Sequence, residues 1–321
     1  MAALVTPRYG YLMGDLALGA STVASVRLPD GVRLHTEIHG GRAEAQTPTI
    51  VLLHGWTLDH RLWHQQIVDI PKRIGGPVRL VAFDLRGHGR STPTPLGTAT
   101  LTQLADDLAA VIRKKVPTGP IILVGHSLGG MAILEYAHRH HETFTQRVAG
   151  VVLVSTSAEG AAHTMYGLNP NLARVVRMVE VSSAGVLARF GPWRMHRPLM
   201  PVLGPGVRWL VFGQEAQDDW VRLTISMVGS ASLRAIGGFR PSVAVHHRVD
   251  ALAAMSEVPV AILVGSRDRL TPVRCSETIA AELPHAVHQI CAGAGHMLPL
   301  ECPDDVTDAI VQVCRQASQV V

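Results

Sequence analysis

The chain has 321 residues, of which 47% are hydrophobic and 17% are charged, so it is long enough to bury a large core and too apolar for an intrinsically disordered protein. Its formal net charge of +4 comes from scattered basic residues, which argues against the clustered basic stripe of a nucleic-acid-binding protein. The four cysteines show no Cys-x-x-Cys spacing, so we expect no cysteine zinc site and no disulfide framework, and a cytoplasmic location is favoured.

Residues 1–24 are expected to form an N-terminal extension. They are fairly apolar, but Arg8, Asp15 and several glycines interrupt them, so the segment is too broken for a transmembrane helix or a signal peptide. Beyond it, apolar runs of strand length alternate with helical patterns. This alternation predicts an α/β fold, with a mostly parallel central sheet flanked by helices, over 25–156 and 257–321.

The first strongly apolar strand is predicted over Thr49–Leu53, and it ends in His54-Gly55-Trp56. In parallel sheets, ligands bind beyond the carboxyl ends of the strands. Trp56 follows the carboxyl end of this strand, so its backbone N–H is a candidate oxyanion donor. Further along, Asp84 and Arg86 are expected to stabilise a loop by hydrogen bonds and ion pairs rather than to take part in chemistry. Crossover helices are expected over 101–115 and 131–141.

The most informative motif is Gly125-His126-Ser127-Leu128-Gly129, which lies between an apolar run and a helix-compatible stretch. A strand-to-helix reversal this short strains the backbone of the central serine and exposes its side chain, and the glycines leave room for neighbouring elements. The helix start also supplies unpaired N–H groups and the positive end of the helix dipole. Ser127 is therefore the candidate nucleophile, and the N–H of Leu128 is the other candidate oxyanion donor.

Between residues 157 and 256 the strand signals vanish, and apolar residues over 171–190 recur at helical spacing. We therefore predict a helical cap inserted into the core over 157–256. Its arginines are typical of a solvated helix face, and the alternatives are weak association with an acidic lipid surface or binding of an anionic substrate. Its large apolar residues are candidates for the cap's own core or for an apolar pocket: Trp193, Met195, Met200, Trp209 and Phe212.

Downstream of the insertion, Val260–Val264 is predicted to be a buried strand, and Asp268 follows its end. This position suits an acid that orients a catalytic histidine. The alternative is structural, because Asp268 also precedes Pro272 closely enough to cap a helix that begins there.

A last strand is predicted over His285–Cys291, and a glycine-flanked loop then carries His296 before a terminal helix. The chain has 17 histidines, so a histidine beside a motif is common, and we interpret His54 and His126 as structural. His296 differs because its loop lies between a strand and a helix, and it is the candidate general base.

The motifs and their order resemble the α/β-hydrolase superfamily, in which the nucleophile, the acid and the histidine follow one another along the chain. The resemblance runs from about Val32 to the end and includes Phe83–Ser91, which is similar to the family loop Asp-x-Arg-Gly-x-Gly-x-Ser. It implies a cap over the active site and no cofactor or metal. Some members carry the acid after strand six, which here indicates Glu159. The implied site consists of the triad Ser127, Asp268 and His296 with backbone donors at Trp56 and Leu128.

The resemblance implies a serine hydrolase that cleaves small to medium acyl esters, including monoacylglycerol-like or lysolipid-like ones, with water as co-substrate. Epoxide hydrolases and haloalkane dehalogenases of the superfamily carry aspartate at the position of Ser127, which argues against both classes. Cofactor-free perhydrolases, carbon-carbon bond hydrolases and acyltransferases keep the serine and stay open as alternatives. So does a non-catalytic ligand-binding protein of this fold. The sequence does not predict the oligomeric state.

Overall fold

The computed structural model describes residues 21–41, 47–160, 168–189, 191, 193–194 and 202–320. Its strands form one sheet in the order β1-β2-β4-β3-β5-β6-β7-β8. The pairs β1–β2 and β2–β4 are antiparallel, and all the others are parallel. The strands are β1 (Thr22–Arg27), β2 (Arg33–His39), β3 (Thr49–Leu53), β4 (Arg79–Phe83), β5 (Ile121–His126), β6 (Val148–Val154), β7 (Val260–Gly265) and β8 (Val287–Cys291). The predicted α/β fold with a mostly parallel sheet is confirmed.

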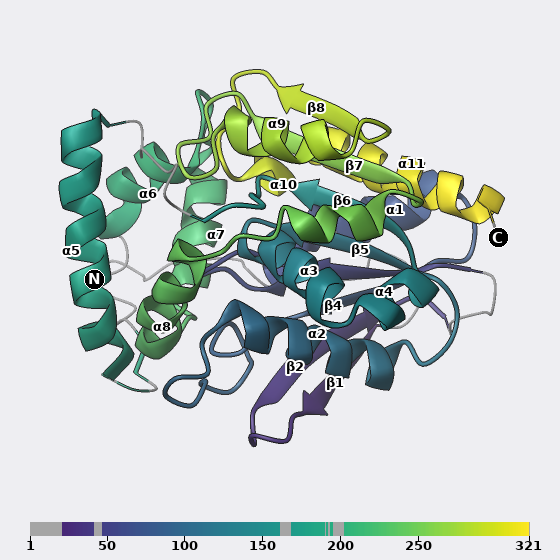
Figure 1. Ribbon diagram of the computed structural model, residues 1–321, viewed down its shortest axis with the longest axis horizontal. Coiled ribbons are helices and arrows are strands. Elements are labelled where there is room, and N and C mark those ends of the chain that lie inside the picture. Colours follow the sequence, from purple (N-terminus) through teal and green to yellow (C-terminus); the bar gives the residue numbers. More distant parts are fainter. Residues whose placement is uncertain are drawn as a thin grey trace, which may run out of the picture.

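Helices cover the sheet. In the described part of the chain, four α-helices and the short helix η4 lie between β6 and β7, and the four α-helices are at the left of Figure 1. Those four are α5 (Pro170–Arg189), α6 (Gly204–Val211), α7 (Asp218–Val228) and α8 (Leu233–Ala244). The remaining helices are η1 (His60–Trp63), α1 (His64–Ile74), α2 (Leu101–Lys115), α3 (Leu128–Arg139), α4 (His141–Arg147), η4 (Asp250–Met255), α9 (Val273–Glu282), α10 (Leu298–Glu301) and α11 (Pro303–Val320).

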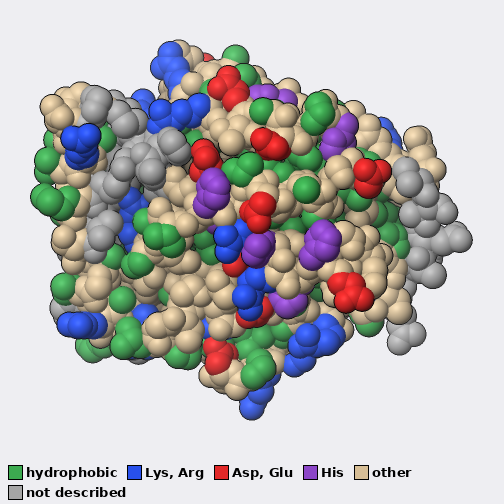
Figure 2. Space-filling view, in the orientation of Figure 1, with side chains coloured by type: hydrophobic (Ala, Val, Ile, Leu, Met, Phe, Trp, Pro, Cys, Tyr) green, Lys and Arg blue, Asp and Glu red, His purple; other side chains and the backbone are tan. Residues whose placement is uncertain are grey.

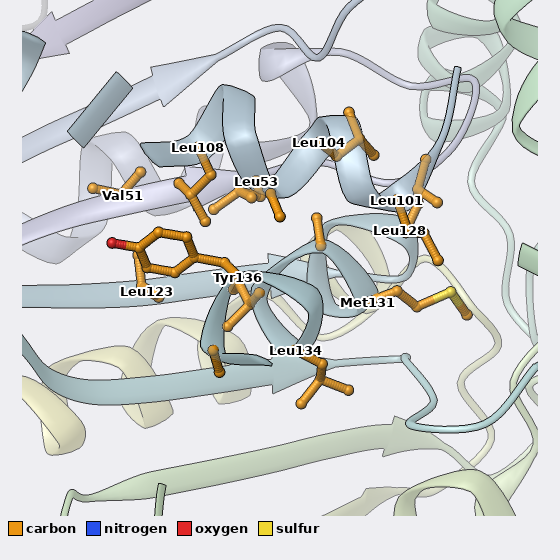
Figure 3. Packing of buried hydrophobic residues seen from close by; sticks show 14 of the residues in the cluster. Val51, Leu53, Leu101, Leu104, Leu108, Leu123, Leu128, Met131, Leu134 and Tyr136 are labelled. Carbon is orange, nitrogen blue, oxygen red and sulfur yellow. The ribbon is translucent and has the colours of Figure 1, made fainter. Parts of the chain in front are cut away.

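Buried apolar side chains fill the space on both faces of the sheet. Along β5, Ile121 and Leu123 join the cluster with α2 and α3, while Ile122 and Val124 join the cluster with α1 and α11. Figure 3 shows the first of these layers, where leucines of α2 lie over residues of β3, β5 and α3. A strand buried on both faces has to be apolar at successive positions, which explains the uninterrupted hydrophobic run before the Ser127 motif.

Three element boundaries differ from the sequence predictions. Strand β1 begins at Thr22, inside the segment expected as an extension, because it pairs along its length with β2; residues 1–20 lie outside the described part. Helix α3 begins at Leu128 rather than 131 and ends at Arg139. Strand β8 begins at Val287 rather than 285, because Ala286 is still in a turn, where its N–H donates to the carbonyl of Leu283.

The described part of the segment between β6 and β7 contributes helices and no strand to the sheet, and α5 agrees with the helical spacing predicted over 171–190. Of its large apolar residues, Phe212 is fully buried and Trp193 is 74% exposed, while Met195 and Met200 lie outside the described residues. None of the described helices combines the length and apolar character that a membrane span requires. Figure 2 shows acidic, basic and histidine side chains interspersed on one face of the molecule.

Candidate active site

The turn between β5 and α3 holds Ser127 in a strained backbone conformation. Its φ of 53° and ψ of −117° lie in a region that side-chain-bearing residues rarely adopt. The N–H of Ser127 donates to the carbonyl of Val154 on the neighbouring strand at 2.9 Å, which fixes the turn against β6. Because the first N–H groups of a helix have no partner within the helix, the N–H of Leu128 is available beside the serine.

Close backbone approach explains the two glycines of the motif. A Cβ on Gly125 would lie 2.6 Å from the backbone nitrogen of Gly130, and a Cβ on Gly129 would lie 2.5 Å from the carbonyl oxygen of Leu53. Neither obstacle is a side chain that can move aside. The tight reversal predicted from the sequence therefore depends on glycine at both positions.

Asp268 and His296 are brought together from the ends of β7 and β8. His296 Nδ1 donates to Asp268 Oδ2 at 2.8 Å, and both residues are at least 95% buried. The other oxygen, Oδ1, accepts the N–H groups of Leu270 and Thr271, each at 2.8 Å. Asp268 does not cap helix α9, which was the alternative role expected from the sequence. The N-cap residue of α9 is Pro272, and no side chain accepts a hydrogen bond from the first turn of this helix as a cap. Asp268 instead stabilises the turn before that helix.

Two residues that sequence reasoning did not assign to the site hold the His296 loop in place. Glu301 accepts three backbone N–H groups, from Gly213 and Gly295 through Oε2 and from Met297 through Oε1, at 2.7 to 3.0 Å. His126 Nε2 donates to the carbonyl of His296 at 2.8 Å. No sequence signal identifies Glu301, because its role depends on backbone N–H groups that come close to it only in the folded structure.

Burial keeps His126 neutral, because desolvation and the nearby His296 lower its pKa well below the usual histidine value. A neutral ring with its proton on Nε2 can donate to the His296 carbonyl without adding charge behind the nucleophile. The structural role expected for His126 agrees with this arrangement. His296 also has a link to the insertion, since its backbone N–H donates to the carbonyl of Val211 at the end of α6, at 2.8 Å.

The turn after β3 passes directly against the nucleophile. A Cβ on Gly55 would lie 2.6 Å from His126 Nδ1 and 3.2 Å from Ser127 Cβ, so the chain approaches the serine as closely as glycine permits. His54 Nδ1 donates to the carbonyl of Gly55 at 2.8 Å, which orients this turn. The next residue, Trp56, lies beside Ser127 in the lining of one cavity.

Ser127 and His296 line this cavity of 620 Å³, which also extends under α6, α7 and α8. In the described part of the chain, no hydrogen bond joins Ser127 Oγ to the His296 ring; such bonds often tighten only with substrate bound. Of the insertion residues considered from the sequence, Trp209 lines the cavity. Most of the residues that the insertion contributes to its lining are apolar: Val202, Leu203, Val207, Trp209, Leu210, Val211, Val228 and Val243.

The loop roles expected for Asp84 and Arg86 agree with their contacts. Arg86 is fully buried and binds Asp107 through Nε at 2.6 Å and Nη2 at 2.7 Å. Asp84 accepts the N–H of Arg90 at 2.7 Å, and neither Asp84 nor Arg86 lines the cavity. Glu159, the alternative acid, lines the cavity and forms an ion pair with His247 at 4.0 Å. Among the described residues, the carboxylate that binds His296 belongs to Asp268.

A sequence model of the alpha/beta hydrolase family matches residues 50–309, most of the chain. The protein therefore belongs to the alpha/beta hydrolase family. It is 24% identical over 273 residues to a pimeloyl-[acyl-carrier protein] methyl ester esterase of Yersinia enterocolitica. The aligned region covers 84% of this chain and 94% of that esterase. It superimposes on a thermophilic esterase from Thermogutta terrifontis with a TM-score of 0.69 and 25% identity, over 92% of this chain and 99% of the esterase.

A partial relative has a different description. The chain is 35% identical over 141 residues to the probable oxidoreductase EphD of Mycobacterium bovis, and this match covers 43% of the chain but only 22% of that protein. The chain thus spans about a fifth of the length of this relative. The comparisons thus place the chain in the alpha/beta hydrolase family, and the relatives and structural neighbours that it resembles include esterases.

Proposed function

We propose that the protein hydrolyses carboxylic esters through an acyl-enzyme formed on Ser127. The observation that carries the proposal is the pairing of His296 Nδ1 with Asp268 Oδ2 at 2.8 Å, next to a strained serine in the same cavity. A histidine held by a buried carboxylate, in the lining of a cavity that a half-buried nucleophile also lines, is the arrangement that acyl transfer requires.

In the proposed mechanism, Ser127 Oγ attacks the ester carbonyl carbon while His296 Nε2 takes the serine proton. Asp268 keeps the other proton on Nδ1, so that the Nε2 lone pair faces the serine, and it stabilises the imidazolium that forms. The N–H groups of Leu128 and Trp56 bind the oxyanion. His296 then protonates the departing alkoxide. A water molecule, deprotonated by the same histidine, hydrolyses the acyl-enzyme and restores the serine.

The cavity supports a substrate with a small to medium acyl group. Its volume of 620 Å³ is within the range of about 300 to 1,000 Å³ typical of small-molecule sites. The lining contributed by α6 is apolar, with Val207, Leu210 and Val211, and the acyl chain would be desolvated against these side chains. A longer chain gains affinity until the cavity is filled, so the preferred length reports the depth of the pocket.

The proposal is tested with p-nitrophenyl esters of increasing acyl length, comparing the wild-type protein with Ser127→Ala. We expect turnover by the wild type that passes through a maximum with chain length, and loss of turnover in the variant to the level left by binding and the oxyanion donors alone. Circular dichroism establishes that the variant is folded. Turnover by folded Ser127→Ala at the wild-type rate would refute the mechanism, and tight binding of esters without any turnover by the wild type would favour a ligand-binding protein.

A further inference from the structure

Helix α5 shows the reverse of the pattern expected for a surface helix. Its small residues Ala173 and Ala184 are buried, and helix α8 packs closely against this side, since a Cβ on Gly237 would lie 2.3 Å from the carbonyl oxygen of Ala184. Several of its larger apolar residues face outward. A helix whose contacts all lie within one soluble chain turns its large apolar side chains to the core. The outer face of α5 is therefore a candidate docking surface.

The exposed apolar residues of α5 form one stripe, which consists of Leu172, Val175, Met178, Val179 and Val186. Each of them is between 47% and 64% exposed. All except Met178 recur at i, i+3, i+7 and i+14, which places them on one face of the helix, and Met178 adjoins that face. Hydrophobic and basic side chains occupy the left edge of Figure 2, where Figure 1 shows α5. Single exposed apolar residues are ordinary, but a contiguous stripe indicates an interaction site.

The charge around the α5 stripe has one sign. Arg174 and Arg189 are exposed on α5 itself, and helical geometry places both on the same flank of the stripe. The surrounding stretch of sequence, residues 160–214, holds six arginines, no lysine and a single acidic residue, Glu180. An exposed apolar stripe flanked by arginines is typical of a helix that lies in the interface of an anionic bilayer.

A lipid bilayer fits this surface better than a second copy of the chain does. A two-fold dimer through α5 would bring the same surface of both protomers together, and with it their arginines. Like charges placed against each other oppose association. Anionic headgroups instead attract the arginines, and acyl chains cover apolar side chains that water would otherwise hydrate. Charge complementarity therefore favours an anionic lipid surface.

Exposed apolar residues continue along the chain beyond α5. Trp193, Val202, Leu203 and Trp209 are all exposed. The last three also line the cavity that contains Ser127, so they form an apolar rim where this cavity opens. Tryptophan is enriched at the boundary between lipid and water. The inserted segment thus exposes apolar surface both on α5 and at the opening of the cavity.

We propose that α5 docks the protein on the surface of an anionic lipid bilayer. The α5 stripe enters the boundary between headgroups and acyl chains, and Arg174 and Arg189 bind lipid phosphates. This attachment is peripheral, and it agrees with the finding that none of the described helices has the length and apolar character of a membrane span. Because docking does not require ester hydrolysis by Ser127, it is tested separately from the proposed function.

The test is co-sedimentation of the full-length protein with vesicles of equal parts phosphatidylglycerol and phosphatidylcholine, compared with vesicles of phosphatidylcholine alone. The valine variant carries Val175→Gln and Val179→Gln. Glutamine favours a helix at least as well as valine does, so α5 should keep its structure, which circular dichroism checks.

The matched control carries Val23→Gln and Val245→Gln, since these valines are at least as exposed but lie on β1 and after α8. The arginine variant carries Arg174→Gln and Arg189→Gln and changes only exposed side chains. If the valine variant does not fold, the arginine variant decides.

We expect saturable binding of the wild type and the control to the anionic vesicles, and binding weaker by about tenfold or more in the valine and arginine variants. The wild type should bind neutral vesicles less, and added salt should weaken its binding, because counterions screen the arginines. Absence of binding by the wild type, equal binding to both kinds of vesicle, or unchanged binding by the two α5 variants would overturn the proposal. Dimers that bind no vesicles and dissociate in the valine variant would assign the α5 stripe to a second copy of the chain.

Discussion

Replacing Asp268 by asparagine changes a single atom at the centre of the proposed mechanism. Oδ1 accepts two backbone N–H groups, from Leu270 and Thr271, and only an oxygen can remain there. The new amide nitrogen of Asp268→Asn must therefore occupy the position of Oδ2, opposite His296 Nδ1. A donor at that position forces the ring into the tautomer that carries its proton on Nε2, and this nitrogen can then no longer take a proton from Ser127.

The expected loss in kcat is about 10⁴-fold, which corresponds to about 5.4 kcal/mol of transition-state stabilisation. The fold should lose much less, because the two backbone hydrogen bonds survive. The bonds that Oδ2 accepts from Thr271 Oγ1 and His296 Nδ1 are exchanged for bonds that the amide donates, at a cost of about 1 kcal/mol. Ester hydrolysis under saturating substrate and urea denaturation measure the two quantities.

Glu159→Gln is the matched control for this prediction, since Glu159 also lines the cavity but has no described bond to His296. We expect its kcat to stay within about tenfold of the wild type. A folded Asp268→Asn that retains kcat within tenfold, together with a large loss in Glu159→Gln, would refute the assignment and place the acid after β6.

Three further changes test the supports of the site and the fold. Glu301→Gln removes a charged acceptor of three backbone N–H groups around His296, so we expect kcat to fall by about 10²-fold. An unchanged kcat would show that the His296 loop keeps its conformation without this carboxylate. Gly129→Ala places a Cβ 2.5 Å from a backbone carbonyl oxygen, so urea denaturation should show a loss of at least about 2 kcal/mol; wild-type stability would mean that the turn can relax. Burial lowers the pKa of His88 to about 3 and of His246 to about 4, so below pH 6.5 the unfolded chain binds protons that the folded chain does not. Stability should therefore fall with acidification, by about 3 kcal/mol for the two histidines between pH 6.5 and 5, and the slope should lessen in His246→Gln; a pH-independent free energy of unfolding would contradict this account.

The sequence predicted those parts of the molecule that depend on local patterns. Strands β3, β5 and β7 were recognisable because burial on both faces requires uninterrupted apolar runs. The turn at Ser127 was recognisable because both of its glycines and the serine lie within one five-residue motif, although the atom that requires Gly129 is the carbonyl oxygen of Leu53 on another strand. The structure also places Asp268 against His296, as their positions after successive strands led us to expect.

Contacts between distant segments were beyond sequence reasoning. Glu301 accepts hydrogen bonds from Gly213 and Gly295, and no spacing rule links a short C-terminal helix to a loop 88 residues upstream. Element boundaries moved by two or three residues because pairing and turns, rather than composition, decide where strands and helices begin.

The central claim is that Ser127 is the nucleophile, and intact-protein mass spectrometry after incubation with a fluorophosphonate tests it most directly. Ser157 also lines the cavity, so Ser157→Ala is the matched control for Ser127→Ala. The account predicts one covalent adduct on the wild type and on Ser157→Ala, and none on folded Ser127→Ala. An adduct that persists in Ser127→Ala, or a wild-type protein that forms none, would contradict it.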